Sequence, residues 1–464
     1  MDFSFAGYMG GGVPIPKLPA VQTVGPSGGD DTQAIQAALD AISDMEPKSG
    51  FRGAVLLQPG EFHCSAALTI RVSGVVLRGS GPEKSGTTLA MSGAPHVAIE
   101  ILGNASWKDA GAPITITDAY VPAGTATFHV ADAAGLAVGD HLRIRRPVTA
   151  EWVAFMGMDK LVRSGKDEHW ISGATEMDRV IQAIKGNEIT VDIALSDSLD
   201  AKYLQPTGAT VSKGEWQGAV SHVGVEDLCL VAPAQAVEIT APHYSGLHLA
   251  GVNDAWVRHV DIENMVGSVG VGATARRVTV ESVRLRHDVP TKGAAKPADL
   301  SVDGGQVLID RCTGSGDNIF YFATGARVIG PNVLLHCRFM GNGHIQPHQR
   351  WATGLLVDGC EVPESGIELM NRGEMGSGHG WTMGWGVVWN CVAKSLTIQA
   401  PPGSMNWAIG CVGARETAAM PFEKSPAMPE GIYESHGHAV KPDSLYLAQL
   451  RERLGPQAVA DIGY

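Results

Sequence analysis

The sequence has no long hydrophobic run. None of its apolar stretches approaches the roughly eighteen uninterrupted residues of a membrane-spanning helix, so no membrane span is expected. The start, MDFSFAGYMGGGVPIPKLPA, lacks the basic and apolar segments of a secretory signal, so none is expected within these 464 residues. Basic runs are also missing and the net charge is −13, which argues against a nucleic-acid partner. An acidic body can still carry a local basic pocket, so an anionic substrate is compatible with this composition.

Cysteine is scarce, and helical periodicity is missing from 220 to 415. The seven cysteines are odd in number and show no CxxC or similar metal spacing, so neither a disulfide framework nor a zinc site is expected. Glycine is abundant instead, at 58 of 464 residues against an average of about 7%. It has no collagen-like period, so the chain is expected to contain many turns.

Short β-like runs recur along the second half of the chain and end at the same kind of residue. Five cysteines occupy this place: Cys312 in VLIDRC, Cys337 in VLLHC, Cys360 in LLVDGC, Cys391 in VVWNC and Cys411 in WAIGC. Their successive spacings are 25, 23, 31 and 20 residues, and Val260 and Val283 occupy the same slot upstream. This stacked strand-like unit predicts an all-β fold, a right-handed parallel β-helix with coils ~4.8 Å apart. The cysteines would form an inward ladder of small hydrophobic residues, with reactive or disulfide-bonded thiols as the alternative.

The repeat is flanked by helices and interrupted once. GDDTQAIQAALDAI (29–42) combines an acidic N-cap with helical apolar spacing and predicts a helix that covers the first coil. PDSLYLAQLRERLG (442–455) predicts a second helix that closes or flanks the far end. Hairpin-like segments with Gly-Asp and Gly-Asn turns predict an antiparallel β-rich insertion. The expected parts are an N-terminal cap with the first coils (1–112), the insertion (113–213), the main β-helix with a cleft (214–420), and a C-terminal tail and helix (421–464).

The N-terminal third resembles a known superfamily. GDDTQAIQAAL, GAVLLQPGEFHCSAALTI and GVVLRGSG are similar to the capping helix, strand and first coil of the pectate-lyase-like right-handed β-helix proteins. The resemblance covers essentially the whole chain apart from the insertion. It implies the fold, but the superfamily includes lyases, hydrolases, epimerases and phage tailspikes, so it does not imply one reaction.

A second motif, GHGWTMG (378–384), resembles the GHG-x-S-x-G signature of polygalacturonase-type hydrolases and places His379 on the site histidine of that family. Those enzymes also use three aspartates from neighbouring coils. Here the Asp-Asp position is Glu364-Ser365, and the Asn-x-Asp position falls in HIQPHQRW, which has no carboxylate. Inverting hydrolysis needs two carboxylates, and Glu368 and Glu374 are the remaining candidates nearby.

The residues that replace the aspartates suit β-elimination on a uronic acid. Parallel stacking brings residues some 20–30 positions apart to within about 5 Å. Arg350 or Arg372 could bind the substrate carboxylate, although an ion pair between coils is an equally good role for either. His348 or His379 would remove the α-proton, and Tyr321 or the other histidine would protonate the leaving oxygen.

Further side chains on the same coils are expected to contact the substrate. They are Asp317, His344, Trp351, Asn371, Glu374, Trp381 and Trp385. Five of the ten tryptophans, Trp351, Trp381, Trp385, Trp389 and Trp407, lie within 57 positions. Indole rings stack on the C–H faces of sugars, whereas the alternative is that Trp385 and Trp389 line the coil interior or cover a helix end.

These observations predict a carbohydrate-active enzyme, foremost a polysaccharide lyase acting on a uronate-containing glycan. One alternative is an inverting glycoside hydrolase or glycan-transferring enzyme that uses Glu368 with Glu374 or Asp317. Another is a non-catalytic, tailspike-like glycan-binding protein. We expect a polysaccharide or oligosaccharide partner, a secreted or periplasmic location, and either a monomer or a homo-oligomer. No cofactor is expected, and no dense acidic cluster predicts an obligatory metal.

Overall fold

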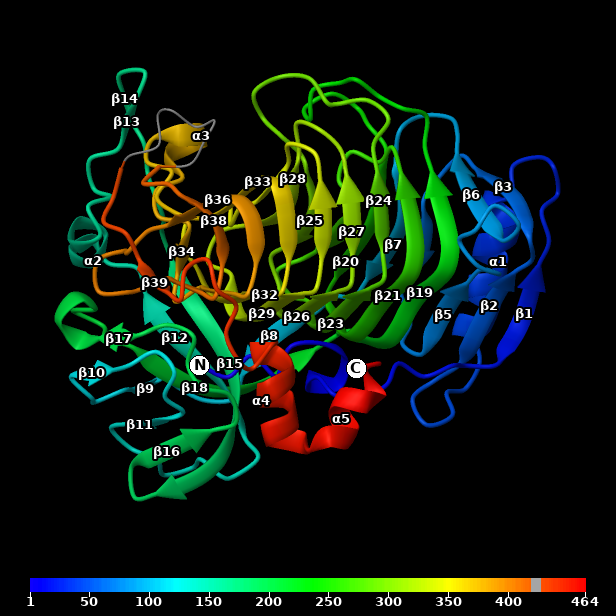
Figure 1. The fold of residues 1–464 in the computed structure, drawn as a ribbon. Helices are drawn as coiled ribbons and strands as arrows, with labels where there is room; N and C mark the ends of the chain where they lie inside the picture. The colour runs from blue at the N-terminus through cyan, green and yellow to red at the C-terminus, as the bar shows by residue number, and fades with distance from the viewer. Residues whose placement is uncertain (419–426) are drawn as a thin grey trace.

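Short strands joined by tight corners wind into a right-handed parallel β-helix in a computed structural model that describes residues 1–418 and 427–464 (Figure 1). Each strand pairs in parallel with the strand one coil later. The predicted fold class is confirmed. Each coil presents up to three strands, and their stacking makes three faces along the axis.

The strands of each face are as follows. The first face contains β1 (Ala20–Val24), β2 (Gly53–Leu57), β5 (Val75–Arg78), β19 (Val220–Val231), β21 (Val252–Glu263), β23 (Arg276–Glu281), β26 (Gly305–Asp310), β29 (Ile329–Leu335), β32 (Ala352–Asp358), β35 (Val387–Trp389), β37 (Trp407–Ile409) and β39 (Ile432–Glu434). The second contains β3 (Gly60–Cys64), β6 (Thr87–Met91), the ends of β19 and β21, β24 (Arg284–Arg286), β27 (Thr313–Ser315), β30 (Arg338–Met340), the starts of β33 (Glu361–Leu369) and β36 (Val392–Ile398), and β38 (Val412–Arg415). The third contains β4 (Leu68–Ile70), β7 (Val97–Leu102), β20 (Ser245–Ala250), β22 (Val269–Val271), β25 (Ala298–Val302), β28 (Phe320–Thr324), β31 (His344–Ile345) and the ends of β33 and β36, while β34 (Met383–Gly384) pairs with the start of β32.

A residue in the left-handed backbone region turns the corner between the first and second faces. It is Arg311, His336, Gly359, Asn390 or Gly410 in the later coils, with φ between 49° and 71°. The next residue points into the coil, and this is the position of the repeated cysteines. All seven cysteines are buried free thiols, and the Cys391 sulfur contacts the backbone N–H of Cys360 at 3.3 Å. The predicted inward ladder is therefore confirmed, and Val260 and Val283 are fully buried in the same slot.

The interior of the third face is a second apolar stack. Leu300, Phe322, Ile345, Ile367 and Leu396 are register partners in successive coils, and all are buried. Each such side chain contributes about 1.5–3 kcal/mol through burial. Because side chains alternate along a strand, the residues that follow Ile345 and Ile367 point outward.

Helices cover one end and one side of the coil. α1 (Thr32–Ser43) packs Ile35, Leu39 and Ile42 against the first coils, so the predicted N-terminal capping helix is confirmed. α4 (Leu445–Leu454) and α5 (Pro456–Asp461) do not close the far end but flank the outer side of the first face (Figure 1). They pack there with the N-terminal segment, which includes the short helix η1 (Tyr8–Gly10).

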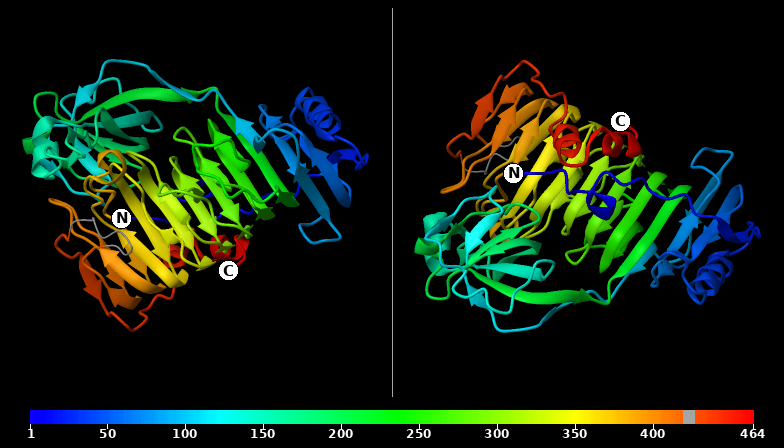
Figure 2. Two further views of the ribbon diagram at one scale, coloured as in Figure 1. Left: turned by 90° about the horizontal axis from the view of Figure 1, so that it is seen from above. Right: turned by 90° about the horizontal axis from the view of Figure 1, so that it is seen from below.

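The insertion is an antiparallel β-domain beside the coil (Figure 2). Its main sheet contains β8 (Ser106–Asp109), β9 (Ile114–Thr115), β11 (Thr127–His129), β12 (His141–Pro147), β15 (Ala174–Lys185), β16 (Glu188–Val191) and β18 (Thr210–Gln217). Smaller elements are the pair β10 (Tyr120–Val121) and β17 (Leu199–Asp200), the hairpin β13 (Val162–Arg163) and β14 (Lys166–Asp167), α2 (Ala150–Phe155) and η2 (Ala201–Tyr203). These strands run several residues beyond 113–213 at each end, and the expected boundary between 420 and 421 lies outside the described residues.

Substitution of Cys360 tests the apolar character of the ladder. Cys360→Ser should lower the free energy of unfolding by about 1–3 kcal/mol because a hydroxyl is more costly to bury than a thiol, although two backbone carbonyls lie 3.6 Å from the sulfur at this position. Cys360→Val should cost less than about 1.5 kcal/mol, since valine fills the equivalent place in other coils. Urea unfolding followed by circular dichroism measures both, and equal losses would contradict the ladder.

Candidate functional site

A hydrogen bond between a histidine and a glutamate on the third face joins two neighbouring coils. His344 lies on β31 and Glu368 on β33, 24 residues later, and the imidazole Nδ1 is 2.6 Å from the carboxylate Oε1. Gln346 donates from Nε2 to the other carboxylate oxygen at 3.2 Å. Glu368 is 0% exposed and His344 5% exposed. A buried carboxylate held by two donors fixes the orientation of the imidazole.

A cleft of about 410 Å³ opens beside this hydrogen-bonded pair. Its walls combine basic and acidic side chains, namely Lys296, His344, Glu364, Lys394 and Glu416. Burial lowers the pKa of Lys296, and the nearby charge of Glu368 acts in the opposite direction. The cleft can therefore present both positive charge and proton-transfer groups to a polar ligand.

A second cluster surrounds Arg372, directly after β33. Its Nη1 donates to the ring Nδ1 of His348 at 2.8 Å and to that of His379 at 3.0 Å. A guanidinium only donates, so both ring nitrogens act as neutral acceptors. Burial and the charge of Arg372 lower the pKa of His348 to about 2 and that of His379 to about 3.

This geometry corrects the predicted base. A nitrogen with so low a pKa is a poor proton acceptor near neutral pH, and both rings already receive an N–H from Arg372. His348 and His379 therefore hold Arg372 in place rather than remove protons. Arg350 lies in the same region and donates to the carbonyl and hydroxyl of Ser377 at 2.6 and 2.8 Å.

Tyr321 does not join either cluster. It lies in the coil interior, stacked on Phe339 at a centroid distance of 4.8 Å, and its hydroxyl donates to the carbonyl of Met340 at 2.5 Å. Burial raises the pKa of Tyr321 above its ordinary value. The predicted role of Tyr321 as the acid is therefore withdrawn.

The predicted tryptophan platform is largely covered by the insertion. Trp351 and Trp381 are buried under Trp152 of α2 and Trp170, which both belong to the segment between β12 and β15. The indole of Trp351 donates to Asp197 at 2.9 Å, and that of Trp381 donates to the carbonyl of Met156 at 3.1 Å. Neither ring can stack on a sugar in this arrangement. Trp385 is half-buried beside Trp407, with ring centroids 6.1 Å apart.

The remaining predicted residues are turn residues. Asn371 is buried, and its Oδ1 accepts a hydrogen bond from the Gly373 N–H at 2.7 Å. Asp317 is exposed and accepts from the Asn342 N–H at 3.2 Å. Glu374 is exposed at the start of the short helix α3 (Met375–Gly378). The cleft lysines Lys296 and Lys394 escaped the sequence analysis because neither lies in a motif; only their coil positions relate them to His344.

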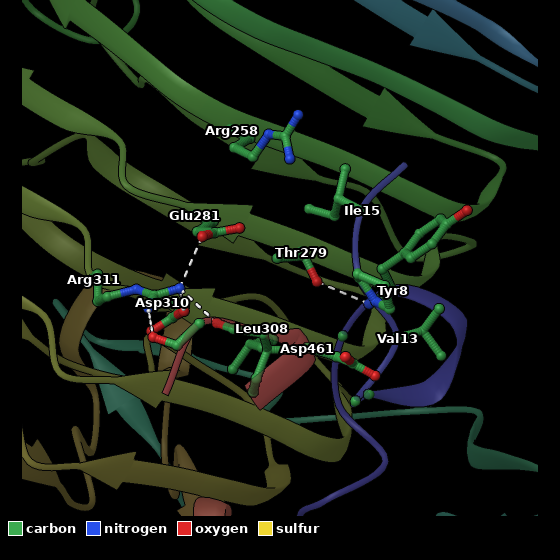
Figure 3. A pocket seen from close by; sticks show the side chains of 16 residues that line it. Tyr8, Val13, Ile15, Arg258, Thr279, Glu281, Leu308, Asp310, Arg311 and Asp461 are labelled. Atoms are coloured by element: carbon green, nitrogen blue, oxygen red, sulfur yellow. Dashed lines mark hydrogen bonds and ion pairs between the residues drawn. The ribbon is translucent and has the colours of Figure 1, made fainter. Parts of the chain in front are cut away.

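Another hollow, of about 240 Å³, lies on the first face between the N-terminal segment and the C-terminal tail (Figure 3). There Arg311 forms ion pairs with Glu281 at 2.8 Å and Asp310 at 2.7 Å. Burial raises the pKa of Asp310 to about 7 against the opposing charge of Arg311. All of the predicted site residues belong to the described part of the chain, and none of them lines this hollow. These charges form ion pairs within the protein, so we interpret this hollow as the place where the N-terminal segment and the C-terminal tail meet.

Among residues 1–418 and 427–464, no group of three or more His, Cys, Asp or Glu side chains is arranged to hold a metal ion. No helix in these ranges is long and apolar enough to cross a membrane. The expectation that no metal is required stays a prediction.

The fold and the cleft define a parallel β-helix protein with a charged site on its third face. No family model and no curated protein matches the chain. Similar solved structures include the tailspike protein gp49 from Pseudomonas phage LKA1, with 14% identity, a TM-score of 0.45 and coverage of 82% of this chain and 56% of that chain. The A-module of mannuronan C-5 epimerase AlgE6 from Azotobacter vinelandii has 12% identity, a TM-score of 0.41 and coverage of 90% and 76%. A mutant tailspike of E. coli bacteriophage HK620 in complex with pentasaccharide has 10% identity, a TM-score of 0.44 and coverage of 89% and 57%.

At these identities the likeness concerns the fold alone. The chain spans little more than half of the two tailspike chains, at 56% and 57%.

The neutral histidines beside Arg372 predict a specific pH dependence of stability. Below about pH 6.5 the unfolded chain binds protons on these histidines, whereas the folded protein does so only near pH 3 or below. The free energy of unfolding should therefore fall as the pH drops from about 6.5 towards 3. His379→Gln should make this fall shallower by up to about 1.4 kcal/mol per pH unit, because one linked proton is removed.

Urea unfolding between about pH 6 and 4 measures this slope. His438→Gln, at an exposed position, is the matched control and should leave the slope unchanged. A parent-like slope in His379→Gln would contradict the neutral, buried state of His379.

Proposed function

We propose that the chain is a carbohydrate-active β-helix enzyme of the pectate-lyase-like superfamily that cleaves a uronate-containing polysaccharide by β-elimination. The observation that carries this proposal is the pairing of His344 with buried Glu368 at the wall of a cleft that also carries two lysines. The sequence resemblance of the first coils to that superfamily supports it. A secreted or periplasmic location, and a homo-oligomeric state, belong to the same proposal.

In this mechanism the lysines bind the substrate and His344 transfers the proton. Lys296 and Lys394 neutralise the uronate carboxylate, which favours the enolate-like state formed when the α-proton leaves. A neutral His344 that donates its Nδ1–H to Glu368 has its lone pair on Nε2, which takes the C5 proton. Glu368 then stabilises the imidazolium.

The elimination is completed without water. The electron pair of the broken C5–H bond forms the C4–C5 double bond, and the C4–O bond to the leaving sugar breaks. The proton from His344 passes to the released oxygen. The products are one new reducing end and one unsaturated uronate end.

A second candidate function is glycoside hydrolysis, and one observation favours it. Glu364 and Glu416 both line the cleft, and two carboxylates are what hydrolysis with an acid and a base requires. Glu364 stands at the Asp-Asp position of the polygalacturonase-like pattern, and its Oε2 accepts from the Gly341 N–H at 2.9 Å.

Loss of His344 should abolish most of the lyase activity. With a panel of uronate polysaccharides, we expect ultraviolet absorbance from the unsaturated product, and His344→Ala should lower kcat by about 10²–10⁴-fold. His438→Gln, exposed and outside the cleft, is the control and should retain full activity. Full activity of His344→Ala would sink its assignment as the base.

Amide substitutions separate the two reactions. For a lyase, Glu364→Gln and Glu416→Gln should each change kcat by less than about tenfold, because neither carboxylate transfers the proton. For a hydrolase, at least one should lower kcat by about 10²-fold or more, and new reducing ends should form without ultraviolet absorbance. Binding without either signal would identify a non-catalytic glycan-binding protein.

A further inference from the structure

A trench runs between the insertion and the corner of the coil at the start of the first-face strands. It consists of two adjoining hollows of about 460 and 340 Å³ that share Asp178, Trp216 and Arg276. The first two residues come from the insertion and the third from β23 of the coil. The insertion lies beside the coil along this side (Figure 2). The cleft at His344 shares no lining residue with either hollow.

Trp216 on β18 forms part of the wall and is half-buried. The guanidinium of Arg276 lies 5.4 Å from its ring centroid. The indole Nε1 of Trp216 is buried and makes no hydrogen bond within the described part of the chain. Because this nitrogen is shielded from solvent, the part of Trp216 that a ligand in the trench can reach is the exposed part of its ring, and an indole face can stack on a sugar.

Arginines from both sides line the trench. Arg276 is held by Asp178 at 3.0 Å and bridges the insertion and the coil. Arg145 is only loosely paired with Glu176, at 3.7 Å. Arg327 is exposed, and its Nη1 donates to the carbonyl of Ser172 at 2.9 Å, a contact that leaves its charge unneutralised. Two acids of the trench, Asp178 and Glu176, are paired with arginines in this way.

One further acid lies at this end of the trench. Asp303 lines the smaller hollow, and burial raises its pKa. At this end of the trench the exposed Arg327 donates to a backbone carbonyl rather than to a carboxylate, and guanidinium groups bind carboxylates through paired N–H donors. An indole beside arginines suits a sugar ring that carries a carboxylate.

We propose that this trench is an accessory binding groove for a carboxylated oligosaccharide, separate from the cleft at His344. It would hold one part of a polymer while another part occupies the cleft, which raises the effective concentration of substrate. The identity of the sugar rests on the proposed function, whereas the existence of the groove rests on Trp216, Arg276 and Arg327.

Binding to a catalytically silenced protein tests the groove. Isothermal titration of His344→Ala with tetrasaccharides of galacturonate, mannuronate, guluronate and glucuronate should give two sites for at least one of them. Adding Trp216→Phe, which replaces the indole by a smaller ring with less stacking surface, should weaken one site by about fivefold. Adding Arg327→Ala should weaken the same site by about tenfold or more. Arg284→Ala, an exposed arginine of the second face, is the control and should change neither site.

The outcomes separate this proposal from the catalytic one. Two sites of which one responds to Trp216→Phe and Arg327→Ala support the groove, even if the parent protein cleaves nothing. A single site, no binding to any tetrasaccharide, or a site insensitive to both substitutions overturns the groove. In a protein whose only substitution is Trp216→Phe, cleavage of a tetrasaccharide at the parent rate together with slower cleavage of the polymer supports the accessory role. Unchanged cleavage rates for both substrates overturn it.

Discussion

The structure depends on the parallel register between successive coils. Each strand is fixed by hydrogen bonds to the strand one coil later, so residues a full coil apart in sequence become neighbours at about 4.8 Å. The apolar stacks of Cys391 on Cys360 and of Ile345 on Ile367 hold this register, since a shift by one residue would turn every inward side chain to the solvent. The hydrogen bond between His344 and Glu368, on the outward side of the third-face strands, is a consequence of the same register.

The insertion changes what the coil surface can do. Its loop packs Trp152 and Trp170 on Trp351 and Trp381, and the indole of Trp351 donates to Asp197. Burying four indoles in one contact fastens the insertion to the coil and removes those rings from the solvent. The insertion also contributes Asp178 and Trp216 to the wall of the trench, so one inserted domain both covers one surface of the coil and forms part of another.

Charge is distributed differently in the two histidine clusters. Beside Glu368 the imidazole Nδ1 of His344 lies 2.6 Å from a carboxylate oxygen. Beside Arg372 the rings of His348 and His379 receive N–H donors and lie close to a positive charge, so they stay neutral. Histidines on adjacent coils therefore differ in their hydrogen-bond partners and in the charge beside them.

The amino-acid sequence determined the coil and its ends. The recurrent cysteines, the Gly, Asn and Asp residues near the corners, and the pattern of Thr32–Ser43 are local or periodic signals, and these identify strands, corners and a capping helix without knowledge of distant contacts. The sequence also located the coils that carry the charged cleft, because coil spacing converts sequence distance into spatial distance.

Only the tertiary structure decided which residues of those coils face the cleft. Tyr321 lies inside the coil because the register shifts between Phe320 and Phe322, an irregularity that reverses the expected side of the strand. The tryptophans are covered by a loop from another part of the chain, and Lys296 reaches the cleft from a turn outside any motif. Side-chain direction and long-range covering depend on contacts between segments far apart in sequence, which periodicity does not encode.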